Sequence, residues 1–140
     1  MYGLEEFVGK HPVRNARSEI EVIETLWRRP LTKSVLVRVG MRFGLSVKQL
    51  ARIYGVTPRT HKMISSRSVL SDSASAHVVQ LAKLYYTGVK IFGSHESFIS
   101  WINRETFALE NIRPIDLLTS ILGIELVRDE MSRMKHGIPP

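Results

Sequence analysis

Residues 45–67 read LSVKQLARIYGVTPRTHKMISSR, which predicts two short helices joined by a tight turn. Ser46 can cap the first helix with its hydroxyl, and apolar residues then recur at helical spacing. Gly55 supplies the positive φ that a chain often adopts just past a helix end. Thr57 is a good cap for the second helix, and Pro58 suits its first position. The stretch therefore predicts a helix-turn-helix.

The exposed face of the predicted second helix carries the candidate DNA-binding residues. They are Thr57, Arg59, Thr60, Lys62 and Arg67. A helix-turn-helix brings the first turns of its second helix to the edges of the bases. Helix corners with a basic second helix also occur in ordinary helical domains, so a purely structural corner is the alternative. His61 stands where an apolar residue usually faces the first helix, and we expect a neutral histidine at the edge of the core.

The charge of the chain is concentrated around this corner. The 140 residues have a net charge of +7, but residues 28–67 contain ten Lys and Arg and no acidic residue. Residues 93–140 contain five Lys and Arg against seven Asp and Glu, a net charge of −2. A solvated basic face is the ordinary explanation of a basic run. Forty residues without a carboxylate, centred on a helix-turn-helix, favour a polyanion such as DNA as the partner.

Several classes of protein do not fit this sequence. No run approaches 18 consecutive apolar residues, and the N-terminus lacks the apolar core of an export signal, so we expect a cytoplasmic protein. The chain has no cysteine, and its five histidines show no spacing typical of metal ligands. Neither a nucleophile–base pair nor a phosphate-binding glycine loop is recognisable. We therefore expect no enzyme, no catalytic residue, no metal and no cofactor.

Helical periodicity recurs along the chain and strand-like alternation is scarce, so the predicted fold is all-α. Residues 1–17 are predicted to form an N-terminal tail or a packed arm. Residues 18–92 are predicted to form a helix-turn-helix DNA-binding and dimerisation domain. Its helices start after Ser18, at Thr32 or Ser34, at residue 46, and at Ser73, with Ser71 and Asp72 as caps. The long helix after Ser71 is apolar on more than one face, which suits a bridge between packed regions or a dimer seam.

Residues 93–140 are predicted to form a second, smaller helical domain. A helix follows Gly93-Ser94, residues 103–112 form a loop, and Pro114 opens another helix. Gly123 is predicted to interrupt the chain before a last helix from Ile124 to about Lys135. Phe92 and Trp101 are expected in the core of this region rather than at a binding surface.

A distinctive series of residues runs from Phe92 to the end. It comprises Phe92-Gly93, Trp101, Leu109, Pro114, Leu117-Leu118, Gly123 and MKHGI at 134–138. In order and spacing this series resembles the toxin-binding domain of the Xre/MbcA/ParS antitoxins. In that family an Xre-like helix-turn-helix precedes the domain, as residues 45–67 do here. The resemblance covers roughly residues 33–140, and it makes 93–140 the toxin-binding domain.

The resemblance implies the antitoxin of a type II toxin–antitoxin system. The cognate toxin would be a RES-domain protein with an ADP-ribosyltransferase-like fold that consumes NAD or uses it to modify a target. The antitoxin would form a homodimer and a higher hetero-oligomer with the toxin, and would repress its own operon through the helix-turn-helix. Its C-terminal segment would block the NAD-binding cleft. The toxin-binding residues would be Arg133, Lys135, His136, Gly137, Ile138, Pro139 and Pro140.

Two alternatives stay open at this point. A terminal segment is commonly frayed and a glycine after a helix is commonly only a cap, so residues 133–140 need not bind anything. For the chain as a whole, the alternative is a stand-alone helix-turn-helix transcription regulator without a toxin partner. The sequence also departs from the family at four places. These are Glu110-Asn111 in place of Gly-Gly, Arg113 in place of Thr or Ser, Thr119 in place of Asp, and Ile121-Leu122 in place of acidic residues.

Overall fold

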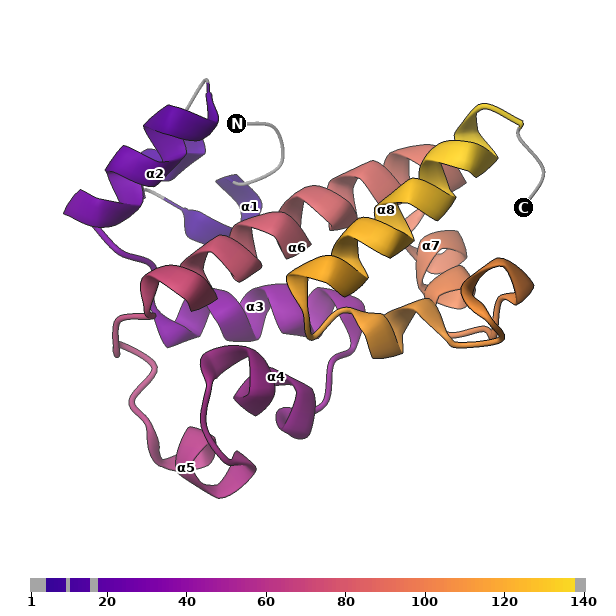
Figure 1. The fold of residues 1–140 in the computed structure, drawn as a ribbon. Helices are drawn as coiled ribbons and strands as arrows, with labels where there is room; N and C mark the ends of the chain where they lie inside the picture. The colour runs from indigo at the N-terminus through magenta and orange to yellow at the C-terminus, as the bar shows by residue number, and fades with distance from the viewer. Residues whose placement is uncertain (1–4, 10, 16–17, 138–140) are drawn as a thin grey trace. The chain divides into compact units, whose positions relative to one another are not determined.

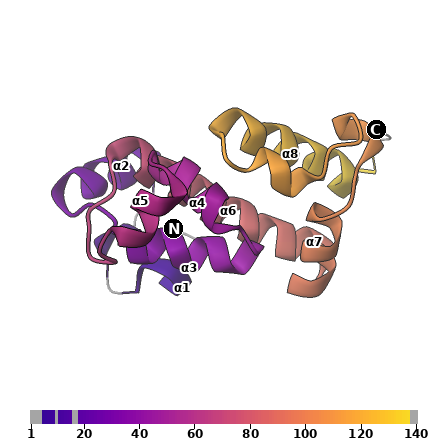
Figure 2. The ribbon, with the colours of Figure 1, turned by 90° about the horizontal axis from the view of Figure 1, so that it is seen from below.

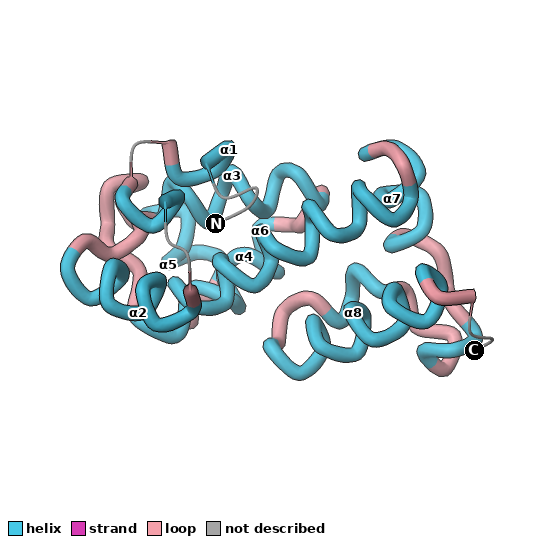
Figure 3. The backbone as a smooth tube through the Cα atoms, turned by 90° about the horizontal axis from the view of Figure 1, so that it is seen from above, coloured by secondary structure: helices cyan, strands magenta, loops and turns pink. Residues whose placement is uncertain are grey.

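The computed structural model describes residues 5–9, 11–15 and 18–137. These residues form helices joined by short loops, and no strand occurs among them (Figures 1 and 3). Only isolated bridges are present, between Thr32 and Val69 and between Thr106 and Ile112. The prediction of an all-α fold is confirmed. No helix in the described part of the chain is long and apolar enough to cross a membrane.

The chain divides into two compact units, Met1–Lys83 and Leu84–Pro140. The division falls inside the long helix α6, Asp72–Phe92. Ser71 begins this helix, because its hydroxyl accepts a hydrogen bond from the backbone N–H of Ala74 at 3.1 Å. The boundary after Phe92 that the sequence suggests stays a prediction.

The first unit contains the predicted helix-turn-helix and the helices before it. Its elements are α1 (Glu5–Val8), the 3₁₀ helix η1 (Pro12–Asn15), α2 (Glu19–Arg28), α3 (Lys33–Phe43), α4 (Val47–Tyr54) and α5 (Pro58–Met63). In its described part, the N-terminal region is an arm that packs, since Phe7, Val8 and Val13 are buried and α1 contacts α3. The predicted cap at Ser18 is present, with its hydroxyl 3.2 Å from the N–H of Glu21.

The second unit is organised around aromatic side chains. After α6 come α7 (His95–Ile102), the 3₁₀ helices η2 (Phe107–Leu109) and η3 (Pro114–Leu117), and α8 (Ile121–Lys135) (Figure 2). The rings of Phe92 and Trp101 lie 5.1 Å apart, and those of Tyr85 and Phe98 lie 6.0 Å apart. Trp101 is buried and Phe92 half-buried, as expected for core residues. Gly88 admits the ring of Phe98, which a Cβ at that position would meet at 2.5 Å.

Gly123 does not interrupt the chain, and this prediction was wrong. The last helix begins at Ile121 rather than Ile124, with Ser120 as its cap, and Gly123 is the third residue of α8. A Cβ on Gly123 would lie 2.7 Å from the carbonyl carbon of Leu117 and closer still to its oxygen. The glycine is therefore required by the close approach of η3 and α8, not by a turn.

The predicted loop 103–112 contains η2 and two residues in the left-handed region. Glu110 has φ 58° and Asn111 has φ 63°. They occupy the positions of the Gly-Gly pair of the family that the sequence resembles. Glycine reaches this conformation without steric cost, so the backbone geometry explains why the family has glycines there.

Candidate functional site

The corner between α4 and α5 has the predicted local structure. Ser46 and Gln49 form a reciprocal capping box at the start of α4. Gly55 ends α4 with φ 97°, and its N–H donates to the carbonyl of Ala51 at 2.8 Å. Thr57 caps α5, whose first residue is Pro58. Because each predicted cap is in place, the sequence alone accounts for the local geometry of the corner.

The position of α5 also depends on a buried lysine in α3. The ammonium of Lys33 donates hydrogen bonds to the carbonyl oxygens of His61 and, at 2.8 Å, of Ile64. These carbonyls lie at the C-terminal end of α5, where helix carbonyls lack partners and a cation is favourable. The backbone N–H of Ser34 donates to the carbonyl of Ser66 at 2.9 Å. The start of α3 therefore holds the end of α5 and the chain that follows.

His61 is buried, as the sequence predicts. Its ring lies edge-on to that of Tyr54, with the centroids 5.8 Å apart. Burial, and to a lesser degree the positive charge of Lys33, lower the pKa of His61 below 6.5. Its Nδ1 is buried without a hydrogen-bond partner. The neutral ring thus acts as a packing group between α4 and α5.

All of the candidate DNA-binding residues, Thr57, Arg59, Thr60, Lys62 and Arg67, are exposed. Two of them also serve the helix itself. The hydroxyl of Thr57 accepts a hydrogen bond from the N–H of Thr60 at 3.2 Å and donates to the Thr60 hydroxyl at 3.0 Å. Arg59 and Lys62 lie on α5, whereas Arg67 lies in the loop after it. Of the three basic candidates, two therefore lie on α5 and one lies beyond it.

The basic run 28–67 is only partly directed to solvent. Lys33 is buried, Arg38 donates to the carbonyl oxygen of Phe7 at 3.3 Å, and Arg42 pairs with Glu6. Arg38 and Arg42 are nevertheless exposed, as are the other basic residues of the run: Arg28, Arg29, Lys48, Arg52, Arg59, Lys62 and Arg67. Three of the ten charges of the run therefore serve the fold, and this division could not be read from composition.

The predicted toxin-binding segment begins within α8. Arg133 pairs with the buried carboxylate of Glu130 at 3.5 Å. The helix ends at Lys135, and His136 and Gly137 form a turn in which Gly137 has φ 69°. Lys135, His136 and Gly137 are exposed. Ile138, Pro139 and Pro140 lie outside the described residues.

The second unit also exposes large apolar side chains that the sequence analysis did not assign to a site. On α8, Leu122 is 68% exposed and Leu126, one turn later, is 47% exposed. Phe107 is 84% exposed on η2, which contacts α8. The opposite face of the helix is buried through Ile124 and Val127, among others. The replacement of acidic residues by Ile121-Leu122 was the one indication in the sequence.

Residues 87–137 match the model of the antitoxin Xre/MbcA/ParS C-terminal toxin-binding domain. This part of the chain is similar to that domain. The matched region begins within α6 and ends at Gly137, so it contains α7, η2, η3 and α8. The resemblance predicted from the sequence is confirmed, and a toxin-binding domain implies a toxin as partner. No curated protein matches the chain.

Proposed function

We propose that this protein is the antitoxin of a type II toxin–antitoxin system that neutralises a RES-domain, NAD-consuming toxin and represses its own operon. The observation that carries the proposal is the match to a toxin-binding domain at 87–137 in one chain with two capped helices, α4 and α5, that fit the predicted helix-turn-helix. The RES identity of the toxin comes from the resemblance. Homodimers, higher hetero-oligomers with the toxin, and a cytoplasmic location belong to the same proposal.

The C-terminal segment is proposed to enter the NAD-binding cleft of the toxin. The exposed ends of Lys135 and His136 suit acidic or phosphate-recognising groups, and Gly137 redirects the chain after the helix. A proline fixes its own φ, so Pro139 and Pro140 would limit the conformations open to this segment. A segment that is already restricted loses less entropy on binding, which favours a short plug.

The outer face of α8 is proposed as a second contact with the toxin. Leu122 and Leu126 form an apolar strip, and Leu122 lies at one of the positions before Gly123 where the family has acidic residues. An apolar strip of this kind suits an apolar area on the partner and excludes one lined with basic groups. This face would therefore select the subclass of toxin, while the tail would block its chemistry.

Deletion of residues 136–140 tests the plug. The truncated protein should still bind the toxin through its folded domain but should no longer restore growth when both are co-expressed. A matched control is Ser132→Ala, an exposed substitution on the same helix that should leave neutralisation intact. Full neutralisation by the truncated protein would refute the plug mechanism.

Arg59 is proposed to read a base and Arg67 to contact phosphate. Arg59 lies in the first turn of α5, and an arginine there can bind guanine in bidentate fashion, worth about 1–3 kcal/mol of discrimination. Arg59→Ala should relax the preference for the operator sequence. Arg67→Ala should weaken binding to all DNA alike, and it should reduce the slope of log K against log salt concentration by about one. Fluorescence anisotropy with operator and unrelated duplexes at several salt concentrations measures both. Equal effects of the two substitutions would remove the assignment.

A stand-alone transcription regulator is the alternative. Co-expression with the product of the neighbouring gene separates the two functions. A stable complex that restores growth supports the antitoxin. If the neighbouring product is not toxic and forms no complex, the DNA-binding regulator is favoured.

A further inference from the structure

Helix α2 has apolar side chains on two faces. Val22 and Leu26 are buried, at 6% and 8% exposure. Ile20, Ile23 and Trp27 are 70%, 55% and 70% exposed. Their spacing of three and four residues places them on one stripe of the helix, so the stripe is continuous. Three large apolar groups on one face of a ten-residue helix are an unpartnered surface, unlike single exposed apolar residues scattered over a protein.

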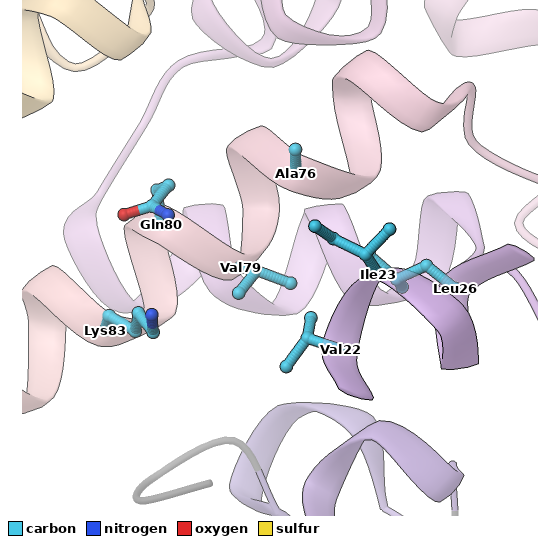
Figure 4. A pocket seen from close by; sticks show the side chains of 7 residues that line it. All are labelled: Val22, Ile23, Leu26, Ala76, Val79, Gln80 and Lys83. Atoms are coloured by element: carbon cyan, nitrogen blue, oxygen red, sulfur yellow. The ribbon is translucent and has the colours of Figure 1, made fainter. Parts of the chain in front are cut away.

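The stripe continues into a groove of the same unit. The groove is lined from α2 by Val22, Ile23 and Leu26 and from α6 by Ala76, Val79, Gln80 and Lys83 (Figure 4). Ile23 belongs to both, since it lines the groove and is more than half exposed. The apolar surface is therefore wider than the stripe alone.

The charges beside the stripe indicate what covers it. Glu21, Glu24 and Arg28 are exposed and lie on one flank of the stripe, at about 40–100° from Ile20 around a helix of 3.6 residues per turn. Glu21 belongs to the first turn of α2, Glu24 to its middle and Arg28 to its last turn. Carboxylates on this flank disfavour DNA. In an antiparallel pair of identical helices, equal flanks meet, and each Arg28 then lies beside Glu21 of the other copy.

We propose that the Ile20–Ile23–Trp27 stripe is the homodimer interface, closed by the same stripe of a second copy in antiparallel orientation. A twofold axis near Ile23 and Glu24 brings Ile20 against Trp27 of the second copy and Ile23 against its own equivalent. Such an isologous interface needs a patch that is complementary to itself, which this stripe and its flank provide. The inference deepens the dimeric part of the proposed function and rests on it. The proposed dimer forms without toxin or DNA.

Sedimentation of the full chain, without toxin or DNA, tests the interface. The wild-type protein should dimerise, and Trp27→Glu should raise the dimer dissociation constant by roughly tenfold or more, the loss expected at an aromatic centre of an interface. Met41→Glu is the matched control, because Met41 is 74% exposed on α3 and outside the stripe. Circular dichroism of each variant verifies the fold. A wild-type monomer at all concentrations, or an unchanged dimer in Trp27→Glu, would overturn the proposal.

Charge reversal tests the orientation. Arg28→Glu makes the flank entirely acidic, and the double variant Glu21→Arg/Glu24→Arg makes it entirely basic. Each variant alone should dimerise less than wild type, whereas an equimolar mixture should form heterodimers. A mixture no more dimeric than its components would refute the antiparallel arrangement.

Cross-linking locates the axis. The chain has no cysteine, so Ile23→Cys introduces a single thiol. Under mild oxidation it should give a disulfide-linked dimer much faster than Met41→Cys at equal concentration. Equal rates would place the contact elsewhere. Binding of the toxin is measured separately, so its failure would leave these outcomes unaffected.

Discussion

Gly123→Ala should destabilise the C-terminal unit by about 1–3 kcal/mol. The added Cβ would meet the backbone carbonyl of Leu117, with 2.7 Å to its carbon, and would lie 3.0 Å from the capping hydroxyl of Ser120. Forcing a methyl group into a packed site costs about 1–3 kcal/mol, and weakening the cap adds about 1 kcal/mol. The higher helix propensity of alanine returns about 1 kcal/mol. A backbone carbonyl cannot rotate away as a side chain can, so the net effect is destabilising.

Urea unfolding followed by tryptophan fluorescence measures this effect. Trp101 is buried in the second unit and Trp27 is exposed in the first, so a Trp27→Phe background leaves one reporter in the unit of interest. Ser132→Ala, at an exposed position of the same helix, is the control for helix propensity. If Gly123→Ala unfolds at the same urea concentration as this control or a higher one, the close approach of η3 and α8 is refuted.

Three further predictions concern the backbone and the buried polar groups. Glu110→Gly should stabilise the second unit by about 0.5–1 kcal/mol in the same assay. Glycine adopts the positive φ of this position without the steric cost of a side chain, and this gain exceeds the greater conformational entropy that glycine loses on folding. Lys33→Met should cost about 1–3 kcal/mol, because it leaves the carbonyl of Ile64 unpaired and leaves that of His61 with the N–H of Ile64 alone; in the proposed function it should also weaken DNA binding without changing its salt dependence. Because the pKa of His61 is lowered in the folded chain, His61 takes up its proton in the unfolded chain first as the pH falls, and the free energy of unfolding decreases. His61→Leu should make this decrease smaller between about pH 7.5 and about 5.5, as measured by urea unfolding.

The local structure of the corner between α4 and α5 could be predicted from the sequence because its determinants are local. Ser46, Gly55 and Thr57 each act within a few residues of their own position, so their spacing fixes the caps and the turn. The contribution of Lys33 could not be predicted in this way. It reaches the end of α5 from 28 residues earlier in the chain, and a lysine in a basic run is expected in solvent.

Gly123 shows the converse limit. In a sequence, a glycine between apolar residues is equally typical of a helix break and of a close contact, and only the position of Leu117 distinguishes the two. The exposed stripe on α2 is a similar case. Helical periodicity identifies Ile20 and Trp27 as apolar positions of one helix, but the number of apolar faces that the fold covers depends on the neighbouring elements.

The division of the chain inside α6 determines how its modules can be exchanged. A fragment beginning at residue 93 would lack Tyr85, Gly88 and Phe92, against which Phe98 and Trp101 pack. A chimera that combines this toxin-binding domain with the N-terminal unit of a different protein therefore has to be joined within the helix, before residue 84. Because each residue turns the helix by about 100°, a junction that gains or loses one residue would shift the donor and recipient helices out of phase. Recombination between antitoxins is thus constrained to crossovers that conserve helical register.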